Sequence, residues 1–498
     1  MESHKESIAA VSAQVSQFYE VQKPFRIYHG STNSTRQLPH ARSNIISTAH
    51  LSHVLDVDQE NHVAVVEPNV PMDQLVQATM AHGLVPLVVM EFPGITAGGG
   101  FSGTSGESSS FRHGFFDATV NWIEIVLPTG QVLKASRQDH PDVFWGAASA
   151  FGTLGVVTLL EVRLKPAKPF VELQYYSATA VDDAVRLFED LTADPATEYL
   201  DGIVYAPDQT VVCAGRLTDS VPDTAAVSHF TRPSDEWFYL HARQRAAAHT
   251  ATASPPVDYI PLSDYLFRYD RGGFWVGRYA YQYFLVPFLF FTRWLLDWFM
   301  HTRVMYHALH ESEHSKQYII QDVAVPYSAT SEFVDWLDQK DNFGAYPIWL
   351  CPLKRSPAPG LMGTSHPGNE YLMNFGLWAP SPYSHDRLGF IDQNRRLEQK
   401  VDALGGKKWL YAQAYYTEDE FWSVYDKKQY DAIRAKYHAG YLPDLYEKVR
   451  VNLKGKYDGQ PGLVAWMKRL VWDIWPVSGL VGVYKAWRGG DYLLRRKR

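Results

Sequence analysis

The sequence predicts an α+β fold with more than one domain. Its 498 residues exceed the roughly 150 of a typical domain. Residues 62–67 alternate like a strand, residues 72–80 have the apolar spacing of a helix, and residues 84–90 form a buried-strand run. Residues 122–127 and 131–135 flank a Pro-Thr-Gly turn, which predicts an antiparallel hairpin. Strands and helices are therefore mixed within one unit.

The other elements follow in sequence order. Residues 1–20 have the pattern of an amphipathic helix. Pro71 suits the first position of the second helix, and Gly83 ends it. Residues 156–164 alternate as a strand up to Pro166, so the first 166 residues form one α+β unit. Mixed strands and helices follow, with helices predicted over 388–404, 418–425 and 430–437.

Composition excludes several classes of protein. Hydrophobic residues make up 46% and charged residues 20%, which is typical of a globular protein. The net charge of −7 argues against a general nucleic-acid binder, because phosphate contacts need a basic surface. Two cysteines, Cys213 and Cys351, cannot form a disulfide framework or a multi-cysteine metal site. The polar N-terminus lacks the apolar region of a secretory signal, so we expect a protein that is not secreted.

Residues 95–110 contain five glycines and several hydroxyl residues, which predicts main chain exposed to an anion such as a phosphate. The alternative is a flexible surface loop. Gly98, Gly100 and Gly103 also match the G-x-G-x-x-G pattern of dinucleotide-binding Rossmann folds. The residues that follow do not form the amphipathic helix that a Rossmann site requires, so we reject that interpretation.

Two further loops flank this segment, at 26–34 and at 152–157. In this order, and with the Pro-Thr-Gly hairpin between them, the loops resemble the FAD-binding domain of the vanillyl-alcohol-oxidase (PCMH) flavoprotein superfamily. Four other stretches resemble one branch of it, the delta(24)-sterol reductases, and the resemblance runs from about residue 20 to 452. These stretches are 104–110, 321–326, 346–352 and 410–412.

The resemblance implies a domain order. It implies an N-terminal helix at 1–19 and a PCMH-type FAD-binding domain of two subdomains at 20–168. An α+β substrate domain would span 169–394, and C-terminal helices at 395–452 would pack near the flavin domain. Residues 453–498 form a tail with a local charge of about +7, set apart from an otherwise acidic protein.

The resemblance also implies FAD as cofactor and NADPH as its reductant. Many members tether the flavin through a histidine, but Asn33 occupies that position here and His29 lies out of register, so we expect non-covalent FAD. The implied FAD-binding residues are Gly30, Ser31, Thr32, Asn33, Ser34, Thr96, Ala97, Gly98, Gly99, Gly100, Phe101, Ser102, Gly103, Thr104, Ser105, Gly106, Glu107, Ser108, Gly114, Gly152, Gly155, Val156 and Val157.

The implied reaction is reduction of a C=C bond (delta24 type) in the side chain of a sterol or related terpenoid, by hydride from flavin N5 and a proton from an enzyme acid. Candidate acids are Glu107, Tyr411 and Tyr415. Glu107 would be protonated in an apolar pocket, or it is a loop carboxylate that accepts backbone N–H groups. The alternative for the two tyrosines is ordinary core packing with a satisfied hydroxyl.

Two alternative functions stay open. One is an FAD-dependent oxidase or dehydrogenase of the same superfamily that acts on an alcohol or hydroxy acid. The other is a non-catalytic lipid-binding flavoprotein. His307, His310 and His314 share a helical face, but the absence of a supporting carboxylate favours a solvated or interface face over a metal site.

Two aromatic segments suggest contact with lipid. Residues 281–300 would line an apolar pocket, touch a bilayer surface or form ordinary core. The tail combines Trp466, Trp472, Trp475 and Trp487 with Lys and Arg, as an interfacial anchor does. Animal and plant members begin with a membrane-spanning segment and this sequence does not. We therefore expect peripheral attachment to the cytoplasmic side of a membrane, the endoplasmic reticulum by the resemblance.

Overall fold

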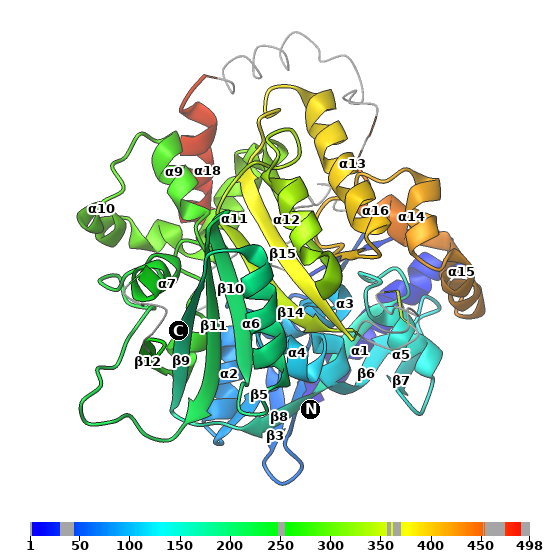
Figure 1. Cartoon of the computed structure of the whole chain (residues 1–498). Coiled ribbons are helices and arrows are strands. Elements are labelled where there is room, and N and C mark those ends of the chain that lie inside the picture. The colour runs from blue at the N-terminus through cyan, green and yellow to red at the C-terminus, as the bar shows by residue number, and fades with distance from the viewer. Residues whose placement is uncertain are drawn as a thin grey trace.

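The computed structural model describes residues 2–29, 44–247, 254–355, 360–361, 370–451, 453 and 474–489. It contains helices and two large sheets of mainly antiparallel pairing, which confirms the predicted α+β class. One sheet comes from the N-terminal third of the protein and the other from the middle, and the C-terminal helices return to the first (Figure 1).

The first sheet has the strand order β3-β4-β8-β6-β7, with β5 paired to β8. Its strands are β3 (Val54–Asp58), β4 (Val63–Val66), β5 (Leu84–Pro86), β6 (Val120–Val126), β7 (Val132–Ser136) and β8 (Val156–Pro166). The predicted hairpin is confirmed as β6–β7. The strand predicted at 84–90 covers only Leu84–Pro86, and its register with β8 ends at Pro86.

Helices α1 (Glu2–Glu20) and α2 (Met72–Met80) confirm the two predicted N-terminal helices. Helix α1 buries Ile8, Val11 and Val15 against the first sheet. The Ser12 hydroxyl donates to the Gly130 carbonyl at 2.6 Å, which ties the helix to the β6–β7 turn. A small parallel pair, β1 (Arg26–Tyr28) with β2 (Ile45–Ser47), follows α1 in the sequence.

The second sheet has the order β12-β9-β11-β10-β14-β15-β13-β16. Its strands are β9 (Phe170–Ala178), β10 (Tyr199–Ala206), β11 (Gln209–Thr218), β12 (Val257–Pro261), β13 (Tyr318–Pro326), β14 (Ile348–Lys354), β15 (Tyr371–Pro380) and β16 (Lys407–Lys408). One face packs against α6 (Val181–Ala193), α12 (Thr330–Asp338) and α13 (Arg387–Ala403) around Phe188, Phe333 and Leu397. The other face shares a hydrophobic core with the first sheet.

The remaining helices surround the two sheets. Between β11 and β13 lie α7 (Phe238–Ala247), α8 (Leu262–Leu266), α9 (Gly277–Tyr283), α10 (Phe290–Leu295) and α11 (Thr302–Glu311). The C-terminal part contains α14 (Glu418–Val424), α15 (Lys427–Lys436), α16 (Leu445–Val449) and α18 (Val477–Gly489), and α18 lies against α11 (Figure 1). Tyr430 and Arg434 of α15 donate to Thr153 of the first domain, at 2.8 and 2.7 Å.

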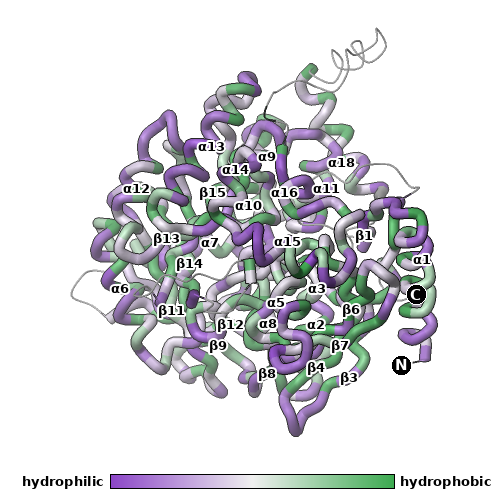
Figure 2. The backbone as a smooth tube through the Cα atoms, turned by 90° about the vertical axis from the view of Figure 1, so that its right-hand side faces the viewer, coloured by the Kyte–Doolittle hydropathy of each residue, from purple (hydrophilic) through white to green (hydrophobic). Residues whose placement is uncertain are grey.

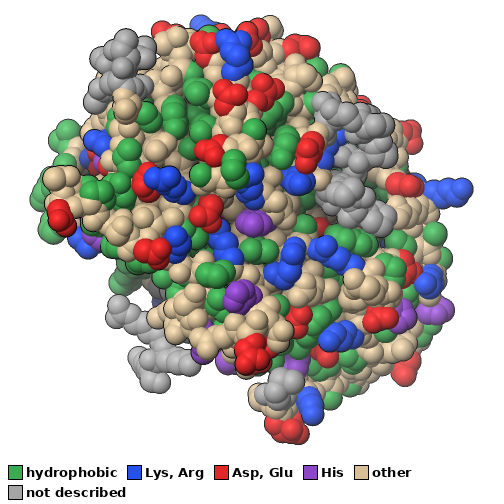
Figure 3. Space-filling model, turned by 60° about the horizontal axis from the view of Figure 1, so that its bottom comes forward, with side chains coloured by type: hydrophobic (Ala, Val, Ile, Leu, Met, Phe, Trp, Pro, Cys, Tyr) green, Lys and Arg blue, Asp and Glu red, His purple; other side chains and the backbone are tan. Residues whose placement is uncertain are grey.

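The distribution of polar residues is that of a globular protein. In Figure 2 the outer helices α12 and α13 are largely hydrophilic, while hydrophobic stretches follow the strands of the first sheet. On the face shown in Figure 3, acidic and basic side chains alternate, without the basic stripe that a nucleic acid would need. Among the described helices, none combines the length and apolarity required to cross a bilayer.

Candidate functional site

A cavity of about 900 Å³ lies between the part of the protein that holds the first sheet and the part that holds the second. One end is lined by the glycine-rich segment at 94–106 and by the loop at 150–157. The other end is lined by apolar side chains of α9, α11 and α18, and of strands β13 to β15. The cavity therefore joins a polar, main-chain-lined region to an apolar region.

Part of the glycine-rich segment folds as a short helix, α3 (Ala97–Gly103), whose residues Gly98, Gly99, Ser102 and Gly103 line the cavity. Thr96 caps it by accepting a hydrogen bond from the Gly99 N–H at 3.2 Å. A Cβ at Gly98 would lie 2.6 Å from Pro68 Cβ, and one at Gly100 would lie 2.4 Å from Met90 Cε. Tertiary packing thus selects a helix that glycine alone disfavours, because only glycine permits this close approach.

The facing loop also depends on glycine. Gly152 has a φ of +76°, and a Cβ there would lie 2.5 Å from Ile27 Cδ1. Gly155 has a φ of +145°, and its Cβ would lie 2.6 Å from the Val126 carbonyl oxygen. These two main-chain surfaces form a cradle without side chains, which is the shape that an extended phosphate-containing cofactor requires.

An acidic pair, Asp322 and Tyr411, lies in the wall of the cavity. Tyr411 donates its hydroxyl hydrogen to Asp322 Oδ2, and the Asn374 side chain donates to Asp322 Oδ1 at 3.1 Å. Desolvation raises the pKa of Asp322 to about 6. Burial, and secondarily the nearby Asp322 carboxylate, raises the pKa of Tyr411 well above its ordinary value. This pair holds exchangeable protons next to an apolar space.

Comparison with known proteins agrees with this geometry. Residues 4–136 match the profile of the FAD binding domain family. Delta(24)-sterol reductase of Homo sapiens is 27% identical over 412 residues, covering 80% of this protein and 76% of that one. The Arabidopsis thaliana and Pisum sativum delta(24)-sterol reductases are 28% and 26% identical, and each alignment covers 83% of this protein and 78% or 77% of the relative. Over most of its length, the protein is therefore similar to the delta(24)-sterol reductases. It is an FAD-dependent oxidoreductase.

In this oxidoreductase, ten of the residues expected to bind FAD line the cavity. They are Thr96, Gly98, Gly99, Ser102, Gly103, Ser105, Gly106, Gly152, Gly155 and Val157. Others lie behind this surface, namely Ala97, Gly100, Phe101, Thr104, Glu107, Ser108, Gly114 and Val156. Gly30, Ser31, Thr32, Asn33 and Ser34 lie outside the described residues, while His29 lines the cavity. The glycine-lined surface of this cradle fits FAD. Non-covalent binding of the FAD stays a prediction.

Of the three candidate acids, Tyr411 alone is among the residues that line the cavity. The Glu107 carboxylate is 2% exposed and accepts hydrogen bonds from the Ser108 hydroxyl at 2.8 Å and from the Ser109 N–H at 3.0 Å. Burial raises the pKa of Glu107, but its partners belong to its own loop, as in the loop-carboxylate alternative. Tyr415 is buried and donates to Gln413 Oε1 at 3.2 Å. Tyr411 is therefore the one candidate acid of the three with access to the cavity.

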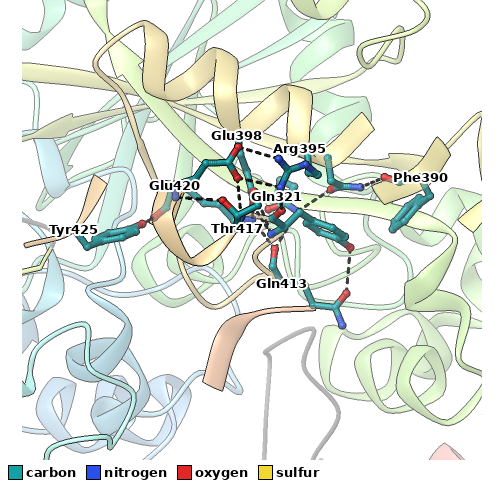
Figure 4. Close-up of polar contacts among 11 residues, drawn as sticks. Gln321, Phe390, Arg395, Glu398, Gln413, Thr417, Glu420 and Tyr425 are labelled. Atoms are coloured by element: carbon teal, nitrogen blue, oxygen red, sulfur yellow. Dashed lines mark hydrogen bonds and ion pairs between the residues drawn. The ribbon is translucent and has the colours of Figure 1, made fainter. Parts of the chain in front are cut away.

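A buried polar network supports the segment that carries Tyr411 (Figure 4). Lys408 and Glu398 form an ion pair, and their side chains are 0% and 1% exposed. Glu398 also accepts the Tyr415 N–H at 2.9 Å, while Tyr425 donates its hydroxyl to the Lys408 carbonyl at 3.1 Å. Arg395 joins Glu420 at 2.9 Å on the same side. Helix α13 thus determines the path of residues 407–417 past the cavity.

Sequence reasoning missed two acids in the cavity wall. Asp322 lies in the 321–326 stretch, and its signal was one carboxylate inside an otherwise buried strand. Glu91 follows the apolar run that begins at Leu84, is 8% exposed, and has no hydrogen-bond partner at Oε1. Burial, and secondarily the nearby Glu107, raises the pKa of Glu91 well above its ordinary value. Burial therefore favours the protonated form of Glu91, which can donate a hydrogen bond.

The described residues contain no group of three or more His, Cys, Asp or Glu side chains that could hold a metal ion. His307 is 7% exposed on α11, and His314 contacts the Ser478 hydroxyl at 3.1 Å through Nε2. Two of the three histidines singled out in the sequence therefore have roles in packing near α18.

Proposed function

We propose that this oxidoreductase uses NADPH as electron source to reduce a C=C bond in the side chain of a sterol or a related terpenoid. The observation that carries the proposal is one cavity with a glycine cradle at one end, an apolar wall at the other and the Asp322–Tyr411 pair beside it. The names of its relatives support a sterol as the substrate class.

Saturating the double bond adds one hydride to one carbon and one proton to the other. Reduced FAD held by Thr96, Gly98, Gly99, Gly152 and Gly155 would supply the hydride. An isolated alkene has no carbonyl to stabilise negative charge, so the protein must deliver the proton from an acid positioned at the second carbon.

Tyr411 and Asp322 can deliver that proton together. When Asp322 is ionised, the Tyr411 hydrogen points to the carboxylate and is withheld from the substrate. When Asp322 is protonated, its O–H can donate to Tyr411 Oη, which frees the Tyr411 hydrogen to point into the cavity. Transfer of that hydrogen to carbon, with the Asp322 proton moving to Tyr411, leaves a carboxylate that water reprotonates later. Asn374 keeps the carboxyl oriented.

Apolar side chains around the pair would exclude water during the transfer. Trp378 and Trp349 lie near parallel, with ring centroids 6.0 Å apart, and Phe274 packs on both. All three line the cavity. A dry wall of this kind accepts a hydrocarbon skeleton and strengthens hydrogen bonds to the acid pair.

A sterol resides in membranes, so the proposal includes work at a membrane surface. The endoplasmic reticulum as the compartment stays a prediction. Trp475 and Trp487 of the predicted tail anchor are exposed, at 53% and 62%, while Trp466 and Trp472 lie outside the described residues.

The test is an absorption spectrum of the purified protein, repeated without oxygen after NADPH is added and again after an unsaturated sterol is added. We expect a flavin spectrum that NADPH bleaches and the sterol restores, with the saturated sterol as product. A flavin that ignores NADPH but is bleached by an alcohol would instead indicate an oxidase or dehydrogenase. Bound flavin that neither NADPH nor any lipid or alcohol reduces would indicate a non-catalytic flavoprotein.

A further inference from the structure

Two segments hold most of the large apolar side chains that are exposed in the described part of the protein. Residues 285–298 contribute seven of them, with Leu285 74% and Phe291 62% exposed. Residues 474–487 contribute five, with Leu480 55% and Trp487 62% exposed. Single exposed apolar residues are normal on a protein surface, whereas a concentration of this kind indicates an interaction site. We call these exposed side chains the apolar patch.

The second segment of the patch touches residues that directly precede the first segment. Trp475 donates its indole N–H to the Tyr283 carbonyl at 2.7 Å, just before the first segment begins. Helix α18 packs closely on α9 and α11 because the residues that face these helices are small. A Cβ at Gly479 would lie 2.4 Å from Tyr283 Cε1, and one at Gly482 would lie 2.6 Å from the Ala308 carbonyl oxygen. The large side chains of α18 therefore point outward.

The two segments that carry the patch also contribute to the cavity wall. Val286 and Leu296 of the first segment line the cavity, as do the preceding Phe284 and, from α18, Leu480 and Val483. Leu480 both lines the cavity and is more than half exposed, so the cavity wall continues into the outer surface at this residue. An apolar molecule that enters here would cross no polar surface.

The exposed charges at the patch are mainly positive, although Lys485 of α18 is paired with Glu311 of α11 at 2.7 Å. Arg293 lies over the Phe288 ring at 5.0 Å, and Arg488 is exposed at the end of α18. The one acidic residue of either described segment, Asp297, is 5% exposed and paired with Arg271 at 2.7 Å. The sequence beyond α18 adds Arg495, Arg496, Lys497 and Arg498. Exposed tryptophans with an excess of cations match the interface of an anionic bilayer better than a protein partner.

We propose that the apolar patch docks on an anionic lipid bilayer and that the substrate passes from the bilayer into the cavity beside Leu480. The proposal rests on the proposed function in one respect, the apolar nature of the substrate. Docking would place the cavity mouth against the acyl chains, so the sterol would reach the acid pair without entering water.

The test is flotation of the flavin-loaded full-length protein with phosphatidylcholine vesicles, with and without phosphatidylserine. The unmodified protein should float, and more of it should float with phosphatidylserine. Phe291→Ser with Trp487→Ser should lose about tenfold or more of the binding, because two large apolar groups no longer leave water. Leu388→Ser is the matched control, since Leu388 is also 62% exposed but lies on α13.

A second variant, Arg293→Gln with Arg488→Gln, should keep binding to neutral vesicles and lose the preference for phosphatidylserine. Flavin absorbance shows whether each variant is folded. An unmodified protein that does not float, or a Phe291/Trp487 variant that floats equally well, would overturn the proposal. A dimer that the same variant abolishes in vesicle-free buffer, without any flotation, would assign the patch to a second copy instead.

The outcomes also separate this inference from the proposed function. Turnover of sterol delivered by cyclodextrin should stay normal in the Phe291/Trp487 variant, while turnover of sterol in vesicles falls with its binding. Flotation of the unmodified protein without reduction of any sterol would remove the proposed function and leave the docking surface standing.

Discussion

Replacing Asp322 by Asn should abolish the pH dependence of sterol reduction near neutrality. Desolvation raises the pKa of Asp322 from 3.8 to about 6. At about 1.4 kcal/mol per pKa unit, the site favours the protonated carboxyl by about 3 kcal/mol relative to water. If the protonated Asp322–Tyr411 pair is the proton donor, the active fraction of the enzyme falls about tenfold per pH unit above pH 6. Asparagine cannot ionise, so the activity of the variant should not fall as the pH rises above 6.

The expected magnitudes follow from the same numbers. At pH 8, about two units above the pKa, kcat/KM of the unmodified enzyme should lie about 100-fold below its low-pH plateau. The Asp322→Asn variant should be flat over the same range and lie about 10²- to 10⁴-fold below that plateau, which is the usual contribution of a general acid. Tyr411→Phe should lose a similar factor and also be flat.

The assay is anaerobic single-turnover oxidation of the reduced flavin by the sterol, which separates proton delivery from flavin reduction by NADPH. Tyr415→Phe is the matched comparison, because Tyr415 is a buried tyrosine whose hydroxyl bonds to Gln413. A fall in activity above pH 6 that persists in Asp322→Asn would refute the assignment of the Asp322–Tyr411 pair as the proton donor. A Tyr415→Phe variant as slow as Tyr411→Phe would return Tyr415 to the candidate acids.

Stability provides an independent readout of the same pKa. Because the folded pKa is raised, the native carboxyl holds its proton between about pH 4 and pH 6 while the unfolded one has lost it. Folding stability due to this group therefore falls as pH rises through that window. The advantage of Asp322→Asn over the unmodified protein should grow by about 1.4 kcal/mol from pH 5 to pH 8 in denaturant titrations. An advantage that stays constant would contradict the raised pKa.

Three further predictions concern the cofactor and the scaffold. Acid precipitation should release all the FAD into the supernatant, whereas flavin that stays with the protein pellet would show a covalent link. Gly98→Ala places a Cβ 2.6 Å from Pro68 Cβ, so it should cost about 1–3 kcal/mol and weaken FAD retention. Gly440→Ala, whose Cβ meets nothing within 4 Å, should do neither. Lys408→Met leaves the buried Glu398 carboxylate unpaired and should cost about 3–5 kcal/mol in thermal or denaturant unfolding, and adding Glu398→Gln should restore most of it. If the effects of the two substitutions on stability simply add, Lys408 and Glu398 are not energetically coupled.

Local patterns were enough to predict much of the first domain. The hairpin β6–β7 needs only a Pro-Thr-Gly turn between two alternating runs, and α1 and α2 need only helical apolar spacing with start and stop residues. The same local rules overestimated the strand at 84–90, because Pro86 ends its pairing with β8. They also did not predict α3, whose glycines pack against Pro68 and Met90.

The candidate site likewise combines residues that local patterns predicted with residues that only tertiary contacts could identify. Glycine and hydroxyl residues that are close together in the sequence predicted the FAD cradle, and the resemblance predicted Tyr411 among three candidate acids. Choosing among the three required their surroundings. Glu107 bonds to its own loop and Tyr415 to Gln413, while Tyr411 meets Asp322 from a strand 89 positions earlier.

By itself, the sequence determined the α+β class and the resemblance to the reductase branch, and it predicted the flavin cradle, because these depend on residues that are neighbours along the backbone. The tertiary structure decided which acids share the cavity, how Lys408 and Glu398 support them, and that residues 285–298 and 474–487 form one surface. Those features are contacts between distant segments. Desolvation and exposure arise only when such segments meet, so neither composition nor local spacing encodes them.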